Sequence, residues 1–281
     1  MSHETESGAR AARMPAVAGM FYPGAVRELH DDVQGLLAAA EPLGNEPAGA
    51  APKAIVAPHA GYIYSGAIAA SAYALLAPRA AAIRRVILLG PTHRVGVRGL
   101  AVPTTEAFLT PLGRVPVDRA AIEALADLPQ VVATDAPHAQ EHSLEVQLPF
   151  LQEVLGPSAS FSLVPLAVGH TSAAEVAAVL DRLWGGEETL IVVSSDLSHY
   201  LPYAVAREID NETARRIVAL DATIDHDEAC GATPVNGLLI AARRRGMRAR
   251  LVDLRNSGDT AGDRSRVVGY GAFTFYEVAH A

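Results

Sequence analysis

Three short apolar runs in this chain each end abruptly on polar residues, and this pattern restricts the folds that the chain can adopt. Each run is rich in Val, Ile, Leu or Ala and is followed at once by small or polar residues that include a histidine. Such runs predict strands buried on both faces, as in a parallel sheet covered by helices. The runs and their polar ends are 54–57 with His59, 85–89 with His93, and 191–193 with Asp196 and His199. Because the carboxyl ends of parallel strands meet at one edge of a sheet, the sequence predicts one shared site there.

Segments with helical spacing of apolar residues alternate with these predicted strands, the first of them at 25–40. This alternation predicts a single-domain, layered α/β sandwich with a mixed, largely parallel central sheet. The segments 250–254 and 267–276 are predicted as the final strands, and the alternating pattern of the last one is typical of an antiparallel or edge strand. Residues 1–13 are polar and small and predict a disordered N-terminal tail, which leaves residues 14–281 as the domain.

The composition is that of a well-packed acidic globular protein. Hydrophobic residues make up 50% of the chain, charged residues 19%, and the formal net charge is -8. This charge argues against nucleic acid and against an anionic membrane as partners. No apolar run approaches the ~20 residues that a bilayer requires, and the N-terminal segment lacks the apolar region of a signal peptide. We therefore expect a cytoplasmic protein, in which the single Cys230 cannot form an intramolecular disulfide.

The candidate functional residues of this predicted site are His59, His93, Asp196, His199 and Cys230. Neutral imidazoles and a thiolate are suitable ligands for zinc, iron or copper. Taken singly, a histidine at a strand end is more often a hydrogen-bonded structural residue, and a lone cysteine is usually a small buried hydrophobe. The similar context of His59 and His93, both of which follow a proline in a strand-to-loop turn, favours a shared metal site.

Other polar residues near these turns are candidates for the wall of the site. Asp196 and His199 lie three residues apart, so that one helical turn would place them on the same face, with His199 as a proton shuttle. The alternative is that Asp196 only caps the turn. Glu141 and His142 stand at a predicted helix start, where an acid is favoured by the helix dipole in any case, and are candidates for the pocket lining. Tyr62 could present its phenol to a substrate or simply pack on the sheet.

The sequence resembles the Memo family, whose bacterial members are called AmmeMemoRadiSam system protein B, over about residues 13–278. Several motifs in family order carry the resemblance, and they are Ala16-Val17-Ala18-Gly19-Met20-Phe21-Tyr22-Pro23, Pro58-His59-Ala60-Gly61-Tyr62, Gly90-Pro91-Thr92-His93, Glu141-His142-Ser143-Leu144-Glu145, Ser194-Ser195-Asp196-Leu197-Ser198-His199 and Cys230-Gly231. The resemblance implies a fold like that of the LigB-type class III extradiol dioxygenases. It also implies one mononuclear metal ion, iron or copper in preference to zinc, held by His59, His93 and Cys230. One departure is Arg94, where many members have an aromatic residue or a histidine.

The resemblance leaves more than one function open. The first hypothesis is a metal-dependent redox enzyme, dioxygenase-like, with His199 as general acid or base and Asp196 fixing its tautomer. The second is a non-catalytic module that binds a peptide, a small molecule or metal and works with partner proteins, since bacterial members associate with AMMECR-type and radical-SAM proteins. A third is a cysteine hydrolase with Cys230 as nucleophile.

Overall fold

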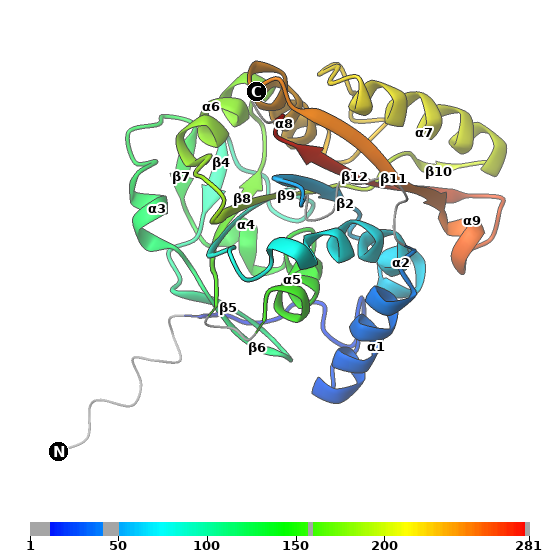
Figure 1. The fold of residues 1–281 in the computed structure, drawn as a ribbon, viewed down its shortest axis with the longest axis horizontal. Coiled ribbons are helices and arrows are strands. Elements are labelled where there is room, and N and C mark those ends of the chain that lie inside the picture. Colours follow the sequence, from blue (N-terminus) through cyan, green and yellow to red (C-terminus); the bar gives the residue numbers. More distant parts are fainter. Residues whose placement is uncertain (1–11, 42–50, 157–159, 279–281) are drawn as a thin grey trace.

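The computed structural model describes residues 12–41, 51–156 and 160–278, and its centre is a large mixed β-sheet (Figure 1). The strand order is β10-β12-β2-β9-β3-β8-β4-β7, and β11 pairs with β12. In chain order the strands of this sheet are β2 (Ala54–Ala57), β3 (Arg85–Pro91), β4 (Leu100–Val102), β7 (Val131–Ala133), β8 (Ser162–Val168), β9 (Thr189–Ser194), β10 (His199–Leu201), β11 (Arg248–Asn256) and β12 (Val267–Tyr276). The four central strands β2, β9, β3 and β8 are parallel, whereas β12 runs antiparallel to β2. The prediction of a mixed α/β sheet is confirmed.

Helices cover both faces of the sheet (Figure 1). In the view of Figure 1, α1 (Val26–Ala39), α2 (Tyr62–Tyr73) and α5 (Leu148–Leu155) lie below the sheet. Above it lie α6 (Ala173–Leu183), α7 (Tyr203–Val218) and α8 (Ala232–Arg244). The short elements are η1 (Ala74–Arg79), α3 (Arg119–Glu123), α4 (Ala136–Ala139), η2 (Glu145–Gln147) and α9 (Ser257–Thr260). Within the described residues, no helix combines the length and the apolar character needed to cross a membrane.

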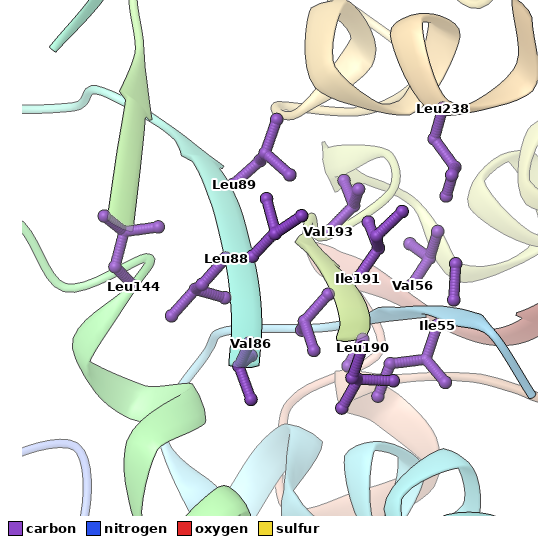
Figure 2. Close-up of a cluster of buried hydrophobic side chains, with 14 of the residues drawn as sticks. Ile55, Val56, Val86, Leu88, Leu89, Leu144, Leu190, Ile191, Val193 and Leu238 are labelled. Carbon is purple, nitrogen blue, oxygen red and sulfur yellow. The ribbon is translucent and has the colours of Figure 1, made fainter. Parts of the chain in front are cut away.

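The core lies where the central strands meet these helices (Figure 2). Ile55 of β2, Val86 of β3 and Ile191 of β9 are fully buried, because both faces of a helix-covered parallel sheet are removed from water. Leu238 of α8 packs into the same cluster. Each such side chain contributes roughly 1.5–3 kcal/mol by leaving water. The core therefore fixes the central strands firmly, and with them the residues that follow each strand.

Local signals set several helix starts. The Asp118 side chain accepts a hydrogen bond from the Ala121 amide and caps α3. Ser172 and Glu175 form a capping box at the start of α6. The helix after β2 begins at Tyr62, and the Ser65 hydroxyl donates to the Ala60 carbonyl from within the helix. This start places α2 close to the end of β2.

The boundary of the predicted N-terminal tail needs a correction. Residues 1–11 lie outside the described residues, but Ala12 and Arg13 form β1, which pairs in parallel with β5 (Ala107–Thr110). β5 also pairs with β6 (Gly113–Pro116), which completes a small three-stranded sheet. The Arg13 side chain is buried and forms an ion pair with Glu145. The tail prediction missed this because the partner of Arg13 is far away in sequence.

Candidate metal centre

The order of the central strands brings the predicted site residues to one edge of the sheet. β9 lies between β2 and β3, and all three run in the same direction. His59 follows the end of β2 by two residues, His93 follows the end of β3 by two, and Ser194 is the last residue of β9. Cys230 comes from a different part of the chain, the loop just before α8. These four residues therefore converge from four separate segments.

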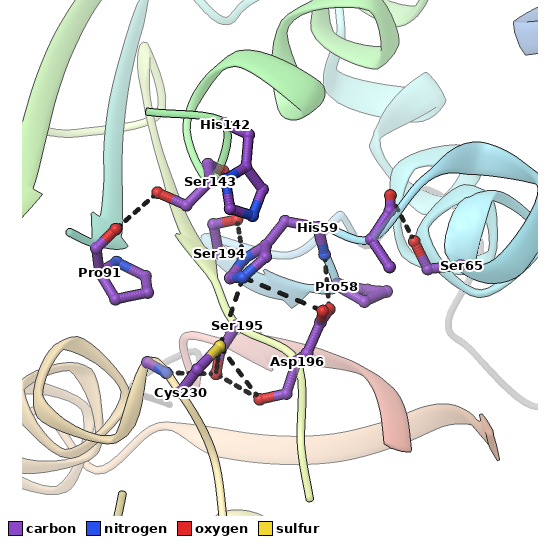
Figure 3. A network of polar contacts seen from close by, with 12 residues as sticks. Pro58, His59, Ser65, Pro91, His142, Ser143, Ser194, Ser195, Asp196 and Cys230 are labelled. Atoms are coloured by element: carbon purple, nitrogen blue, oxygen red, sulfur yellow. Dashed lines mark hydrogen bonds and ion pairs between the residues drawn. The ribbon is translucent and has the colours of Figure 1, made fainter. Parts of the chain in front are cut away.

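His59, His93 and Cys230 form a group that could hold a metal ion. Their ligand atoms all lie within 4.8 Å of one another. The Sγ atom of Cys230 is 3.3 Å from Nε2 of His59 (Figure 3). The ring centroids of His59 and His93 are 5.2 Å apart. His59 is buried, whereas the Cys230 side chain is half-buried. The sequence prediction that these three side chains share one place is thus matched by the geometry.

Hydrogen bonding fixes which nitrogen of His59 faces the cysteine. The Ser194 hydroxyl has one proton, and it is donated to the Ser143 carbonyl at 2.6 Å. Ser194 Oγ must therefore act as acceptor for its other partners, which are Nε2 of Gln147 at 2.8 Å and Nδ1 of His59 at 2.9 Å. Nδ1 of His59 consequently carries the proton. The lone pair is left on Nε2, the atom beside Cys230, and this is the form in which imidazole binds a metal.

The same tautomer is imposed on His93 by Glu141. Nδ1 of His93 lies 2.8 Å from Oε1 of Glu141, and the His93 amide donates to Oε2 at 2.5 Å. Burial opposes the ionised form of Glu141, but these hydrogen bonds outweigh it and lower the pKa of the carboxyl to about 2. An ionised carboxylate can only accept, so Nδ1 of His93 is the donor and Nε2 is the nitrogen left for a metal. Glu141 is buried and is not among the residues that line the cavity described below, so it orients His93 instead of contacting a ligand there.

The electrostatics of the group favour a cation. Burial keeps the pKa of His59 well below its usual value, and so the ring is neutral at physiological pH. Burial and the nearby Asp196 raise the pKa of the Cys230 thiol to about 12. The surrounding protein groups therefore do not stabilise a thiolate. A metal ion held by the two imidazoles would supply the missing positive charge, since a coordinating thiol loses its proton.

Asp196 and His199 are arranged differently from the prediction. Residues 195–198 form a loop and His199 begins β10, so the two side chains do not share a helical turn. Oδ1 of Asp196 accepts the His59 amide at 2.7 Å, and Oδ2 lies 4.0 Å from Nε2 of His59 (Figure 3). Nδ1 of His199 donates to the Leu197 carbonyl at 2.8 Å. Leu197, and not Asp196, therefore fixes the tautomer of His199, while Asp196 holds the turn that carries His59.

A cavity of about 1120 Å³ opens over this group. Its lining includes the three candidate ligands, Asp196, His142 and His199. The His142 ring stacks on His93 at 4.6 Å and meets the edge of His59 at 5.4 Å, as the predicted pocket residue should. Tyr62, which the sequence suggested as a substrate-binding residue, is buried, and its hydroxyl donates to the Val146 carbonyl. Tyr64, two residues later, lines the cavity instead.

Three residues near the group were missed by sequence reasoning. Ser194 and Gln147 position His59, as described above, and Phe21 lines the cavity with its ring 4.8 Å from that of His142. The doubled serine at the end of β9 was a visible signal for Ser194. Phe21 and Gln147 lie in or beside family motifs, but their roles could not be read from them, because those roles depend on contacts with distant segments.

Comparison with known proteins gives one consistent result. The family model described as Memo-like protein matches residues 13–274. A MEMO1 family protein of Methanosarcina barkeri is 36% identical over 274 residues, which span 92% of this chain and 98% of the relative. A MEMO1 family protein of Aquifex aeolicus is 38% identical over 270 residues, 92% of this chain and 97% of the relative. One from Methanopyrus kandleri is 36% identical over 284 residues, 94% and 98% of the two chains.

Proposed function

The chain belongs to the Memo-like protein family, and from this premise we propose that it binds one transition-metal ion through His59, His93 and Cys230 and uses it in redox chemistry. The observation that carries the proposal is the pair of imposed tautomers. Ser194 and Glu141 accept from both Nδ1 atoms, so the Nε2 atoms are the ones left to bind a metal beside the only cysteine of the chain. Histidines that bind a metal almost always donate their other ring N–H to a neighbouring acceptor in this way.

The ligand set supports iron or copper more than magnesium or calcium. Thiolate and imidazole are soft or intermediate ligands, and hard cations prefer carboxylate and carbonyl oxygen. In this proposal the metal supplies Lewis acidity and one-electron chemistry when it is bound. Zinc would also accept these ligands, but it has no redox chemistry.

The protein side chains would bind the reactant and move protons. His199 lines the cavity, and because its Nδ1 donates to Leu197, its Nε2 atom is the one that can take up or release a proton. In this proposal His199 is the general acid or base and His142 contacts the reactant beside His93. A fold like that of LigB-type extradiol dioxygenases is part of the same proposal. It is supported by the family resemblance and by the mixed sheet with its site at the strand ends.

A cysteine hydrolase is less well supported than metal binding. A nucleophilic cysteine requires a lowered pKa, but burial and Asp196 raise the pKa of Cys230 to about 12.

A non-catalytic binding module remains the second candidate. The volume of the cavity and the exposure of Tyr200 at its edge favour it, because a peptide or partner segment could enter there. AMMECR-type and radical-SAM proteins are the partners we propose from the family resemblance, and the cytoplasm is the compartment.

The proposal can be tested by elemental analysis of untagged protein. We expect about one metal ion per chain in the wild type and almost none in His59→Ala or Cys230→Ser. His170→Ala is the control, because His170 is exposed and is not among the residues that line the cavity. Full metal content in Cys230→Ser would refute the ligand assignment.

The enzyme and the binding module are separated by oxygen consumption. Anaerobic loading with iron(II) or copper(I), followed by O₂-uptake measurements with a reductant and a panel of small substrates, should show consumption that His199→Gln lowers. Stoichiometric metal without O₂ uptake under any of these conditions would favour the binding module.

A further inference from the structure

The segment that carries Asp196 and His199 is held on two sides by backbone hydrogen bonds. On one side is β12, where Leu197 N donates to the Gly269 carbonyl at 2.8 Å and Gly269 N donates to the Ser198 carbonyl at 2.8 Å. On the other side is α7, where Oδ1 of Asp210 accepts the Ser198 amide at 3.0 Å. The amide and the carbonyl of Ser198 are thus both held, immediately before His199.

Asp210 is an unusual residue for this task, because it is a carboxylate only 2% exposed. Within the described residues, no ion pair joins Asp210 to a cation. Arg207 of α7, Arg255 of β11 and Asp259 of α9 share a cavity of about 60 Å³ with it, but Arg255 pairs with Asp253 and Asp259 accepts Tyr203. Burial raises the pKa of Asp210 to about 6. Burying a carboxylate without a counter-ion costs free energy, and an apolar residue could fill the same space without that cost. Packing alone therefore does not explain Asp210.

The backbone around Asp210 is shaped to admit its carboxylate. A Cβ atom on Gly269 would lie 2.1 Å from Oδ2 of Asp210, so any other residue at 269 would push the carboxylate away. The contact therefore requires a specific pair from two elements, Asp210 of α7 and Gly269 of β12.

The same segment contains a strained residue next to His199. Tyr200 has a φ of 59°, in the left-handed region that non-glycine residues rarely adopt. The pairing of β10 with β12 shifts register between His199 and Leu201. Such a conformation persists only where surrounding contacts enforce it. The bonds from Asp210 and Gly269 are the contacts that hold the backbone just before this strained position.

We propose that Asp210, with Gly269, is a positioning residue that holds the Ser198 backbone and thereby sets the place of His199 in the cavity wall. The inference rests on the proposed function in one respect, namely that His199 acts in the metal cavity. Asp210 itself lines a different cavity and need not touch a ligand.

The test uses the full chain and compares Asp210→Ala with Asp210→Asn. Asparagine keeps an oxygen that can accept the Ser198 amide, whereas alanine does not. We expect amide hydrogen exchange in the segment 196–200 to speed up at least tenfold in Asp210→Ala and to stay within about threefold of wild type in Asp210→Asn. The imidazole NMR signal of His199, assigned with His199→Gln, should shift in the alanine variant and be restored in the asparagine variant. Glu208→Ala is the matched control, because Glu208 is an exposed carboxylate on the same helix.

Gly269→Ala provides a second route to the same result. We expect it to reproduce the exchange and NMR changes of Asp210→Ala, and to add little in a double variant with Asp210→Ala, since the displaced carboxylate is then already gone. If Asp210→Ala does not fold, the comparison of Gly269→Ala with Asp210→Asn still tests whether Asp210 positions the Ser198 backbone.

Unchanged exchange and an unchanged His199 signal in folded Asp210→Ala, or in Gly269→Ala, would overturn the inference. Metal content is measured on the same samples. Absence of metal in the wild type would refute the proposed function but would leave the exchange and NMR comparison valid.

Discussion

Single hydroxyl and carboxyl groups decide which imidazole atoms are available in this protein. Ser194 has one proton to donate and gives it to a carbonyl, so it must accept from His59. Glu141 is ionised and must accept from His93. Both residues engage the Nδ1 atoms, and they thereby determine that the Nε2 atoms are the ones left to bind a metal.

We predict that Ser194→Ala lowers metal affinity about 10- to 100-fold, the usual effect of removing a hydrogen bond that orients a ligand. The reason is that Nδ1 of His59 loses its acceptor and the ring can rotate or change tautomer. Competition with a chromophoric chelator measures the affinity. Ser71→Ala on α2 is the control, because its hydroxyl bonds the Ala67 carbonyl and Asp253, away from the cavity. Equal affinity in Ser194→Ala and wild type would contradict this role.

Asp210 gives a second prediction at this scale. Its pKa rises from 3.8 in the unfolded chain to about 6 in the fold, because burial penalises the charge. The stability that the protonated form contributes is therefore complete below pH 3.8 and is lost as pH rises through about 6. Relative to Asp210→Asn, the wild type should lose about 3 kcal/mol between these pH values. Urea denaturation of both proteins at pH 4 to 7 measures the difference in the free energy of unfolding. If this free energy changes with pH in the same way in both proteins, the raised pKa of Asp210 is ruled out.

At the scale of elements, the N-terminal strand β1 and the turn η2 are joined through one buried carboxylate. Glu145 accepts the Ala16 amide at 2.7 Å, the Val17 amide at 3.0 Å and the Tyr22 hydroxyl at 2.6 Å, and it pairs with Arg13. This connection holds the segment that ends in Phe21, whose ring contacts His142. The N-terminal segment therefore helps to build the cavity wall.

We expect Glu145→Gln to destabilise the protein by about 3–5 kcal/mol, because it leaves the buried Arg13 without its charge partner. Glu212→Gln, which breaks an exposed pair with Arg215, should cost no more than ~1 kcal/mol. Chemical denaturation followed by tryptophan fluorescence compares the two. A loss for Glu145→Gln no larger than that for Glu212→Gln would show that the ion pair does not hold the N-terminal segment.

At the scale of the whole molecule, the candidate metal ligands come from segments that are far apart in sequence. His59, His93 and Cys230 come from after β2, after β3 and before α8. A ligand that binds only the folded arrangement stabilises the whole fold by mass action.

Metal should therefore raise the melting temperature of protein that has first been stripped with chelator. At a free metal concentration 100 times Kd the gain is about 2.7 kcal/mol. This corresponds to roughly 5–10 °C for a chain of this size class. Differential scanning calorimetry with and without added metal measures the shift, and His59→Ala should show almost none. A shift of the same size in His59→Ala would place the metal elsewhere.

Much of this architecture was predictable from local sequence. The apolar runs before His59, His93 and Ser194 indicated buried parallel strands, because hydrophobic patterning is a property of neighbouring residues. The edge of the sheet where the site lies followed from strand direction. Cys230 was a candidate from its chemistry alone, and the family resemblance grouped it with His59 and His93 as the metal ligands. The family assignment is confirmed.

What only the tertiary structure decided concerns contacts between distant segments. Nδ1 of His59 donates to Ser194 because Ser194 gives its own proton to Ser143, and Nδ1 of His93 donates to Glu141. The burial of Arg13 depends on Glu145, and the orientation of His199 depends on Leu197. The sequence pattern does not distinguish Tyr62 from Tyr64. In the structure α2 begins at Tyr62, and Tyr64 is the one that lines the cavity. Local sequence specifies which residues reach the edge of a sheet. Proton positions and orientations depend on hydrogen-bond partners that only folding brings within 3 Å.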